Sequence, residues 1–148
     1  MGMSPKLKMM TIEEWRELGF YYDYINEEKC WLFIGSKKGI SKLYYIIEQY
    51  CQPQNAQISE HAHFGPYMYL KIVTWTEPII NENGIYGSLE DLSKLADTIK
   101  TRLNKIEPLG VIEIDEEYST NNQSHIKIII RDDNFDPASE DSHLFEGK

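Results

Sequence analysis

Two histidines two positions apart, His61 and His63, form the most chemically suggestive pattern in the 148-residue chain. In an extended segment such side chains project from the same face, so the two imidazoles could share a metal ion. Zinc sites use three or four His, Cys or carboxylate ligands, and His125 or an acidic residue could complete the set. The pattern gives one functional alternative, a zinc-binding protein or small hydrolase centred on His61 and His63. Histidines near a strand start are more often surface or interface residues, and in that interpretation the protein needs no cofactor.

Other signatures of chemistry point away from catalysis. Cys51 could be a nucleophile activated by one of these histidines, but helical spacing places it on an apolar stripe, which favours a structural role. The run from Asp132 to Glu140 begins like a calcium loop, yet Pro137 replaces the required glycine and His143 the final glutamate. Dinucleotide-binding, P-loop and nucleophile-elbow motifs do not occur in the sequence. We therefore assign no catalytic residues.

Tyrosine is frequent, with ten residues, and three tryptophans accompany it. Both residue types are enriched in protein interfaces, because they combine a large apolar surface with a polar end. Buried members of the set would belong to the edge of the core, whereas exposed members would suit binding. The residues that we assign to a binding surface are His61, His63, Tyr67, Tyr69, Tyr22 and Tyr24.

Net charge bounds the class of partner. The chain has 24 acidic and 15 basic side chains, a formal net charge of −9. Nucleic-acid binders generally need clustered basic residues to displace counterions, and the sequence contains no such cluster. We expect a protein partner, and a basic one is favoured because opposite charge speeds association. Surplus acidic charge that serves only solubility is the alternative.

Composition is that of a globular protein. Hydrophobic residues make up 41% of the chain and charged residues 26%, and no apolar run reaches the roughly 18 residues of a membrane span. The N-terminal segment lacks the apolar stretch of a secretory signal. Two isolated cysteines, Cys30 and Cys51, do not form a disulfide framework. We expect a single domain in a reducing cytoplasm.

The elements that position these residues centre on one apolar strand. From Tyr67 to Trp75 nearly every residue is aromatic, β-branched or otherwise apolar on both faces, as is typical of a strand inside a sheet. Gly65 and Pro66 are expected to set its start.

Two segments of similar sequence flank this strand. Gly35 to Ile47 and Gly87 to Ile99 both fit G-S-x-x-x-[I/L]-S-K-L-x-x-x-I, 52 positions apart. Each opens a helical pattern of apolar residues, and Ser36 and Ser88 occupy the N-cap position. The pattern predicts two related strand-strand-helix units on one sheet, arising by duplication or by chance similarity of common residues.

The remaining elements complete an α+β fold, a mostly antiparallel sheet with two main helices on one face. A short helix is predicted over Thr11 to Gly19, with a capping box at its start and Gly19 at its end. The other predicted strands are Phe20–Ile25, Cys30–Ile34, Ile85–Tyr86, Val111–Ile114 and His125–Arg131. Residues 1–131 form the domain, and residues 132–148 form an acidic, flexible tail that is ordered only where Phe135 or Leu144 docks.

Residues Trp31 to Leu103 combine a helix opened by Gly-Ser, a polar linker, the H-x-H-x-G-P-Y motif of residues 61–67 and a second helix. This order resembles small bacterial immunity proteins of polymorphic-toxin systems. The resemblance implies a non-catalytic cytoplasmic protein that binds and blocks a cognate toxin, and it transfers no site residues. Our leading hypothesis is a protein-interaction module, with an immunity protein against a basic toxin as its most specific form. A small-ligand binding domain and a homodimer formed through an edge strand are compatible with the same sequence.

Overall fold

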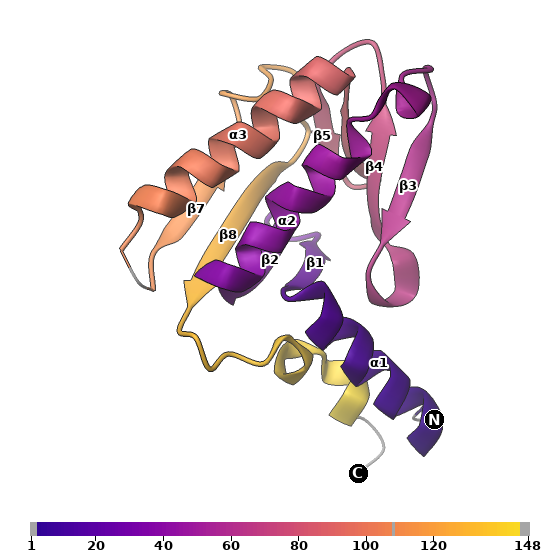
Figure 1. The fold of residues 1–148 in the computed structure, drawn as a ribbon, viewed down its shortest axis with the longest axis vertical. Coiled ribbons are helices and arrows are strands. Elements are labelled where there is room, and N and C mark those ends of the chain that lie inside the picture. The colour runs from indigo at the N-terminus through magenta and orange to yellow at the C-terminus, as the bar shows by residue number, and fades with distance from the viewer. Residues whose placement is uncertain (1–2, 108, 146–148) are drawn as a thin grey trace.

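The computed structural model describes residues 3–107 and 109–145 (Figure 1). The helices are α1 (Pro5–Leu18), α2 (Lys37–Tyr50) and α3 (Leu89–Lys105). The strands are β1 (Tyr21–Ile25), β2 (Cys30–Ser36), β3 (His61–Phe64), β4 (Leu70–Thr74), β5 (Ile79–Asn81), β6 (Gly84–Gly87), β7 (Val111–Ile114) and β8 (His125–Arg131). Four short 3-10 turns are η1 (Pro53–Asn55), η2 (Pro66–Met68), η3 (Pro137–Glu140) and η4 (Ser142–Phe145). None of the helices in these described ranges is long and apolar enough to cross a membrane.

The α+β class agrees with the prediction, but the strands form two sheets instead of one. Their orders are β1-β2-β8-β7 and β3-β4-β6-β5. In each sheet a central parallel pair, β2 with β8 or β4 with β6, is flanked by antiparallel partners. The chain runs hairpin, helix, hairpin twice, and each sheet takes one hairpin from each half. The two halves therefore share both sheets.

The two similar sequence segments occupy the same place in each half. Each spans the end of a central strand and the start of a main helix, α2 or α3. Ser36 accepts a hydrogen bond from the Gly39 N–H at 3.0 Å, and Ser88 accepts one from the Asp91 N–H at 3.0 Å. Both serines are thus the predicted N-caps, which satisfy otherwise unpaired amides of the first helical turn.

The core lies between the helices and the sheets. In Figure 1, α2 and α3 run side by side across them. The buried helix stripes comprise Ile40, Leu43, Ile47, Leu92, Leu95 and Ile99, and the sheet adds Ile126, Ile128 and Ile130. Full burial of one such side chain stabilises the fold by about 1.5–3 kcal/mol. Truncating Leu95 to alanine would therefore cost about 2–5 kcal/mol, because a cavity adds to the lost transfer energy.

Helix α1 starts earlier than predicted. Ser4 is its N-cap, accepting from the Leu7 N–H at 3.2 Å, and Pro5 occupies the first helical position, where its missing N–H costs nothing. Thr11 lies inside the helix and donates its hydroxyl to the Leu7 carbonyl, so the predicted capping box was wrong. The end agrees with the prediction, since Gly19 adopts a left-handed φ of 94°.

The predicted strand from Tyr67 to Trp75 is shorter than expected. Gly65 and Pro66 open the turn η2, and the strand β4 begins only at Leu70. Tyr67 and Met68 have φ values of 65° and 57°, left-handed conformations that a strand does not contain. The apolar run therefore divides into an exposed aromatic turn and a buried strand.

The structure also differs from the predicted flexible tail. The turns η3 and η4 pack along α1 (Figure 1, yellow beside indigo), and residues 146–148 lie outside the described ranges. Arg16 donates two hydrogen bonds to the Asp136 carboxylate, at 3.2 and 2.9 Å. Ala138 and Leu144 are buried against the core; docking at Leu144 was expected. Two apolar anchors and polar contacts to α1 hold a segment whose composition alone is typical of disorder.

Candidate binding pocket

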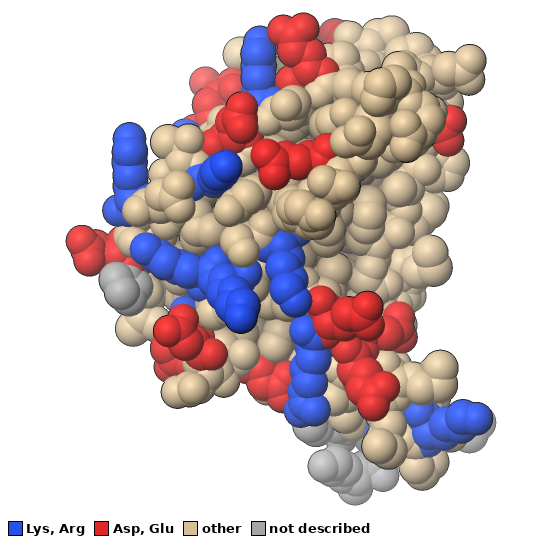
Figure 2. All heavy atoms as spheres, in the orientation of Figure 1, with Lys and Arg blue, Asp and Glu red and all other residues tan. Residues whose placement is uncertain are grey.

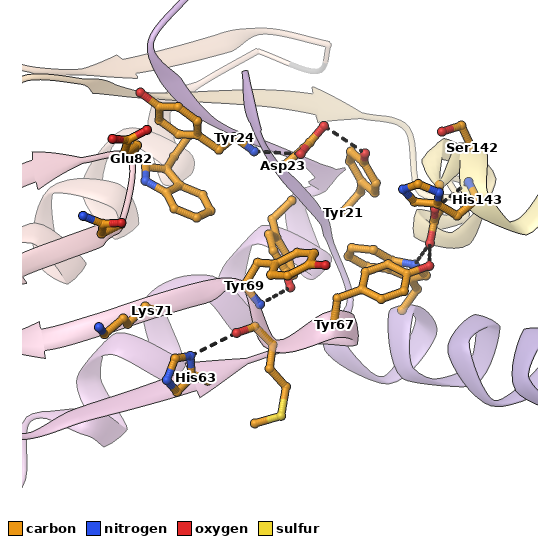
Figure 3. A pocket seen from close by; sticks show the side chains of 16 residues that line it. Tyr21, Asp23, Tyr24, His63, Tyr67, Tyr69, Lys71, Glu82, Ser142 and His143 are labelled. Carbon is orange, nitrogen blue, oxygen red and sulfur yellow. Dashed lines mark hydrogen bonds between the residues drawn. The ribbon is translucent and has the colours of Figure 1, made fainter. Parts of the chain in front are cut away.

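Aromatic side chains from distant parts of the chain surround a hollow of about 460 Å³ (Figure 3). We call it the tyrosine pocket. It is lined by Trp15 of α1, Tyr21, Tyr22, Asp23, Tyr24 and Trp31 of β1 and β2, His63, Tyr67, Met68, Tyr69 and Lys71 of the β3–η2–β4 segment, Glu82 and Asn83 of the β5–β6 turn, and Asp141, Ser142 and His143 of the tail. Its volume lies within the range of ligand sites, about 300–1,000 Å³.

Hydrogen bonds of the Tyr22 hydroxyl hold the turn η2. The Tyr22 hydroxyl donates to the Pro66 carbonyl and accepts from the Tyr69 N–H at 3.1 Å. Burial raises the pKa of this phenol to about 12, so it remains a donor at neutral pH. Gly65 has a φ of 77°, and a Cβ there would lie 2.6 Å from the Tyr22 ring. The chain therefore turns at a position that favours glycine, because a side chain there would meet the Tyr22 ring. The hydroxyl of the same tyrosine holds the turn.

This support leaves three large side chains open to solvent. Tyr67 is 37% exposed, Met68 59% and Tyr69 69%. The Tyr67 and Tyr69 rings stack with centroids 5.8 Å apart and an interplanar angle of 27°. A cluster of exposed aromatic and thioether groups on a rigid turn is uncommon in a protein surface without a partner.

Asp141 closes the pocket on the tail side. Its side chain, only 2% exposed, accepts from the Trp15 indole N–H at 2.8 Å and the Tyr67 hydroxyl at 2.7 Å. It also accepts from the His143 backbone N–H at 2.9 Å. Burial, followed by the Asp141 hydrogen bond, raises the pKa of Tyr67. Asp141 therefore orients Trp15 and Tyr67 in one wall of the pocket, and its carboxylate already accepts hydrogen bonds from neutral donors.

Two further carboxylates, Asp23 and Glu82, line the pocket. Asp23 accepts from the Tyr24 N–H at 2.8 Å and more weakly from the Tyr21 hydroxyl at 3.5 Å. Burial, and next the charge of Asp23, raises the pKa of Tyr21. Among residues 3–107 and 109–145, the salt bridges involve neither Asp23 nor Glu82. Lys71 is the only lysine or arginine of the described lining.

The charge of the pocket is a local property. On the face shown in Figure 2, acidic and basic side chains are mixed over α2 and α3, so the net charge of −9 does not form one continuous acidic surface there. The pocket lining holds three carboxylates against one lysine.

The predicted binding residues meet at this pocket with one exception. Tyr22, Tyr24, His63, Tyr67 and Tyr69 all line it, whereas His61 does not. The lining residues that sequence analysis did not assign to a site include Asp23, Trp31, Glu82 and Asp141. The sequence did not indicate the acidic lining residues, because no local pattern shows that the β5–β6 turn and the tail lie beside β1.

The histidine pair lies on the exposed edge strand β3. The His61 and His63 rings are 5.3 Å apart and perpendicular, and their Nδ1 atoms lie 3.1 Å from the Ser59 carbonyl and 3.0 Å from the Met68 carbonyl. His125, the proposed third ligand, opens β8 in the other sheet. Within the described part of the chain no group of three or more His, Cys, Asp or Glu residues could hold a metal ion.

Cys51 forms the C-cap of α2 and is half-buried. Burial raises the pKa of its thiol to about 11, the opposite of the shift that activates a nucleophilic cysteine. This agrees with the structural role that the helical pattern favoured.

Comparisons with protein-family models, curated proteins and solved structures give no match for this chain. The function of this chain is therefore inferred from the geometry and chemistry of the tyrosine pocket.

Proposed function

We propose that this protein is a non-catalytic interaction module that binds a basic protein partner at the tyrosine pocket and the turn η2. The observation that carries the proposal is the exposure of Tyr67, Met68 and Tyr69 on a fixed turn at the rim of an aromatic hollow. Interface cores are enriched in Tyr, Trp and Met, and the energy of binding concentrates on such anchors.

The rigidity of the turn favours binding. Tyr22 hydrogen-bonds both sides of η2, and Asp141 holds the Tyr67 hydroxyl. Ordering a mobile side chain at an interface costs about 0.5–1.5 kcal/mol. Rings that are already oriented avoid much of that cost, so this surface suits recognition of a partner without rearrangement.

Two polar groups of the pocket, Asp141 and His63, are engaged in structural contacts. The buried Asp141 has neutral donors on both oxygens, and His63 Nδ1 lies against the Met68 carbonyl. Neither is arranged as a base beside a nucleophile, the geometry that covalent catalysis requires. These contacts favour a binding role.

The specific form that we propose is an immunity protein that neutralises a basic toxin. Its support is the acidic charge at the pocket, where Asp23 and Glu82 line the aromatic surface and form no salt bridge with another described residue, together with the resemblance in the order of elements. A basic toxin would be steered towards these carboxylates.

Site-specific photo-crosslinking tests the proposal. A photoreactive phenylalanine analogue replaces Tyr69 in the full-length protein in its source cell, and the same analogue replaces Tyr45 as a control. Tyr45 is 57% exposed on α2 and does not line the tyrosine pocket. We expect one basic protein to crosslink from position 69 and not from position 45, and to be toxic unless co-expressed with this chain.

Equal crosslinking from both positions, or none from position 69, would overturn the proposal. A zinc determination on the same protein, purified without chelators, tests the metal alternative. Stoichiometric zinc that disappears in a His61→Ala, His63→Ala variant would replace the interaction proposal with a metal-dependent function.

A further inference from the structure

We infer that the tyrosine pocket is a receptor for a single cationic side chain, lysine or arginine, of the bound protein. This inference rests on the proposed function, and it specifies which chemical group of the partner enters the pocket.

The walls of the pocket are aromatic on several sides. The rings of Tyr21 and Tyr24 are half-buried, and a buried tryptophan supports each of them: Trp15 lies 5.0 Å from Tyr21 and Trp31 lies 5.4 Å from Tyr24 between ring centroids. A lysine ammonium or arginine guanidinium over such rings is attracted by their negative faces, most strongly when water is excluded. The stem of either side chain is apolar and can lie along the ring surfaces.

The carboxylates supply the matching charge. Among the described residues, the hydrogen-bond donors to Asp23 are both neutral, the Tyr24 N–H and the Tyr21 hydroxyl. Neither it nor Glu82 forms a salt bridge within the described ranges. A carboxylate at the edge of an apolar hollow is stabilised by an opposite charge, so these two groups favour a cation over a neutral or anionic ligand.

The basic residues of the described lining are Lys71, His63 and His143. Figure 3 shows Lys71 and His63 on the β3–β4 side, while Asp23 and Glu82 lie on the side of β1 and Tyr24. The buried Asp141 and the neighbouring His143 lie on the tail side of the pocket. Asp23 and Glu82 therefore form a separate acidic end beside the aromatic residues of β1 and β2. A cation is expected at that end.

The rim indicates that the cation belongs to a protein chain. Tyr67, Met68 and Tyr69 extend the apolar surface outward from the hollow. A small cation would leave this rim uncovered, whereas the residues around a lysine or arginine of a partner would cover it and exclude water from the charge pair.

Binding of small probes tests the assignment on the full-length protein. The probes are N-acetyl-arginine amide, N-acetyl-lysine amide and N-acetyl-citrulline amide, which has nearly the shape of the arginine probe but no charge. Protein NMR shifts report the affinity and the position of binding. We expect both cations to bind with dissociation constants of about 1–10 mM and citrulline to bind about tenfold more weakly or not at all.

Paired variants locate the site. Asp23→Asn should weaken the cations about fivefold, while Asp97→Asn, the same change at an exposed position of α3, should leave binding unchanged. Tyr69→Leu keeps an apolar side chain but removes the ring, and it should weaken the cations severalfold, whereas Tyr45→Leu should not. The Asp23 effect should shrink at high salt, because screening reduces an exposed charge interaction.

Equal affinity for arginine and citrulline, or binding unaffected by both Asp23→Asn and Tyr69→Leu, would overturn the cation receptor. So would the absence of binding by both cations at about 50 mM. If partner crosslinking from position 69 persists in that case, the interaction surface stands and only the cation assignment fails. If cations bind as expected but no partner crosslinks, the proposed function fails instead.

Discussion

The bond between Trp15 and Asp141 makes a quantitative prediction about the tail. The indole is 1% exposed and the carboxylate 2%, and their atoms are 2.8 Å apart. In an Asp141→Ala variant the buried indole N–H loses this acceptor, which costs about 1–3 kcal/mol. The Tyr67 hydroxyl and His143 N–H also lose their acceptor but can reach water at lower cost. We expect a total destabilisation of about 3 kcal/mol.

A double-mutant cycle isolates the bond itself. Trp15→Phe removes the donor and keeps most of the ring, and it should cost about 2 kcal/mol because the carboxylate stays buried with one donor fewer. Once the donor is gone, removing Asp141 costs less. The double variant should therefore be about 1.5 kcal/mol more stable than the sum of the single effects predicts.

Urea unfolding followed by circular dichroism measures all four free energies, and thermal unfolding gives a second measure. For a chain of this size about 3 kcal/mol lowers Tm by roughly 6–12 °C. Asp133→Ala is the matched control, because Asp133 is an exposed acid of the same segment and its loss should change stability by less than about 0.5 kcal/mol. A coupling energy within about 0.5 kcal/mol of zero would show that the tail is not docked through this bond.

Three further changes test other parts of the fold. Gly65→Ala should destabilise the protein by about 1–3 kcal/mol in thermal unfolding, since the left-handed φ of 77° and the Tyr22 ring both oppose a Cβ; an unchanged Tm would contradict the close contact. The hydrogen bond from Arg16, the largest effect, lowers the pKa of Asp136 below its ordinary 3.8. The stabilisation that the Arg16–Asp136 interaction gives to the folded protein is therefore present above pH 3.8 and is lost as the pH falls through the lower pKa of the folded state. Asp136→Asn should accordingly flatten the acid limb of the stability curve relative to wild type. Cys51, whose pKa burial raises to about 11, should react with a thiol reagent at pH 8 much more slowly in the native than in the urea-unfolded protein; equal rates would refute its protection.

The local sequence pattern predicted correctly those elements whose formation depends mainly on neighbouring residues. The bounds of β7 and β8 match the prediction. In β8, Ile126, Ile128 and Ile130 are buried and alternate with residues that are less buried, as the period of a strand predicts. The N-caps Ser36 and Ser88 were predicted because capping depends only on the next three residues.

The features that local pattern missed depend on distant partners. Tyr67 and Met68 belong to an apolar run that favours a strand, but Tyr22, 44 positions from Pro66, holds that segment as a turn. Asp141 lies 126 positions from its partner Trp15, so composition alone described the tail as disordered. The choice between one sheet and two was equally nonlocal, because parallel pairing between the halves decides which hairpins meet.

The candidate binding residues were chosen by their type and frequency, and only partly by their spacing. Tyr67 and Tyr69 were expected in a strand, and they instead stack at the turn η2 and its C-cap. His61 shares a strand face with His63, yet only His63 reaches the pocket. Side-chain chemistry thus selected residues that line one pocket, whereas the acidic lining residues Asp23 and Glu82 became apparent only in the tertiary fold.

Comparison of the two halves explains why a pocket exists on one side. In the second half, the β7–β8 loop covers the strand β5: the Ile80 N–H donates to the Asn122 side chain, and the Ile80 carbonyl accepts from the Gln123 and Ser124 amides. In the first half, β1 has the corresponding place, but the β3–β4 turn is short and contacts it through the Tyr22 hydroxyl. The space that the longer loop fills in the second half is therefore left between β1 and η2 in the first. Helix α1 and the tail narrow this space with Trp15 and Asp141 without filling it. The proposed binding function is thus located at the shorter of the two corresponding loops, where β1 and η2 border the aromatic hollow.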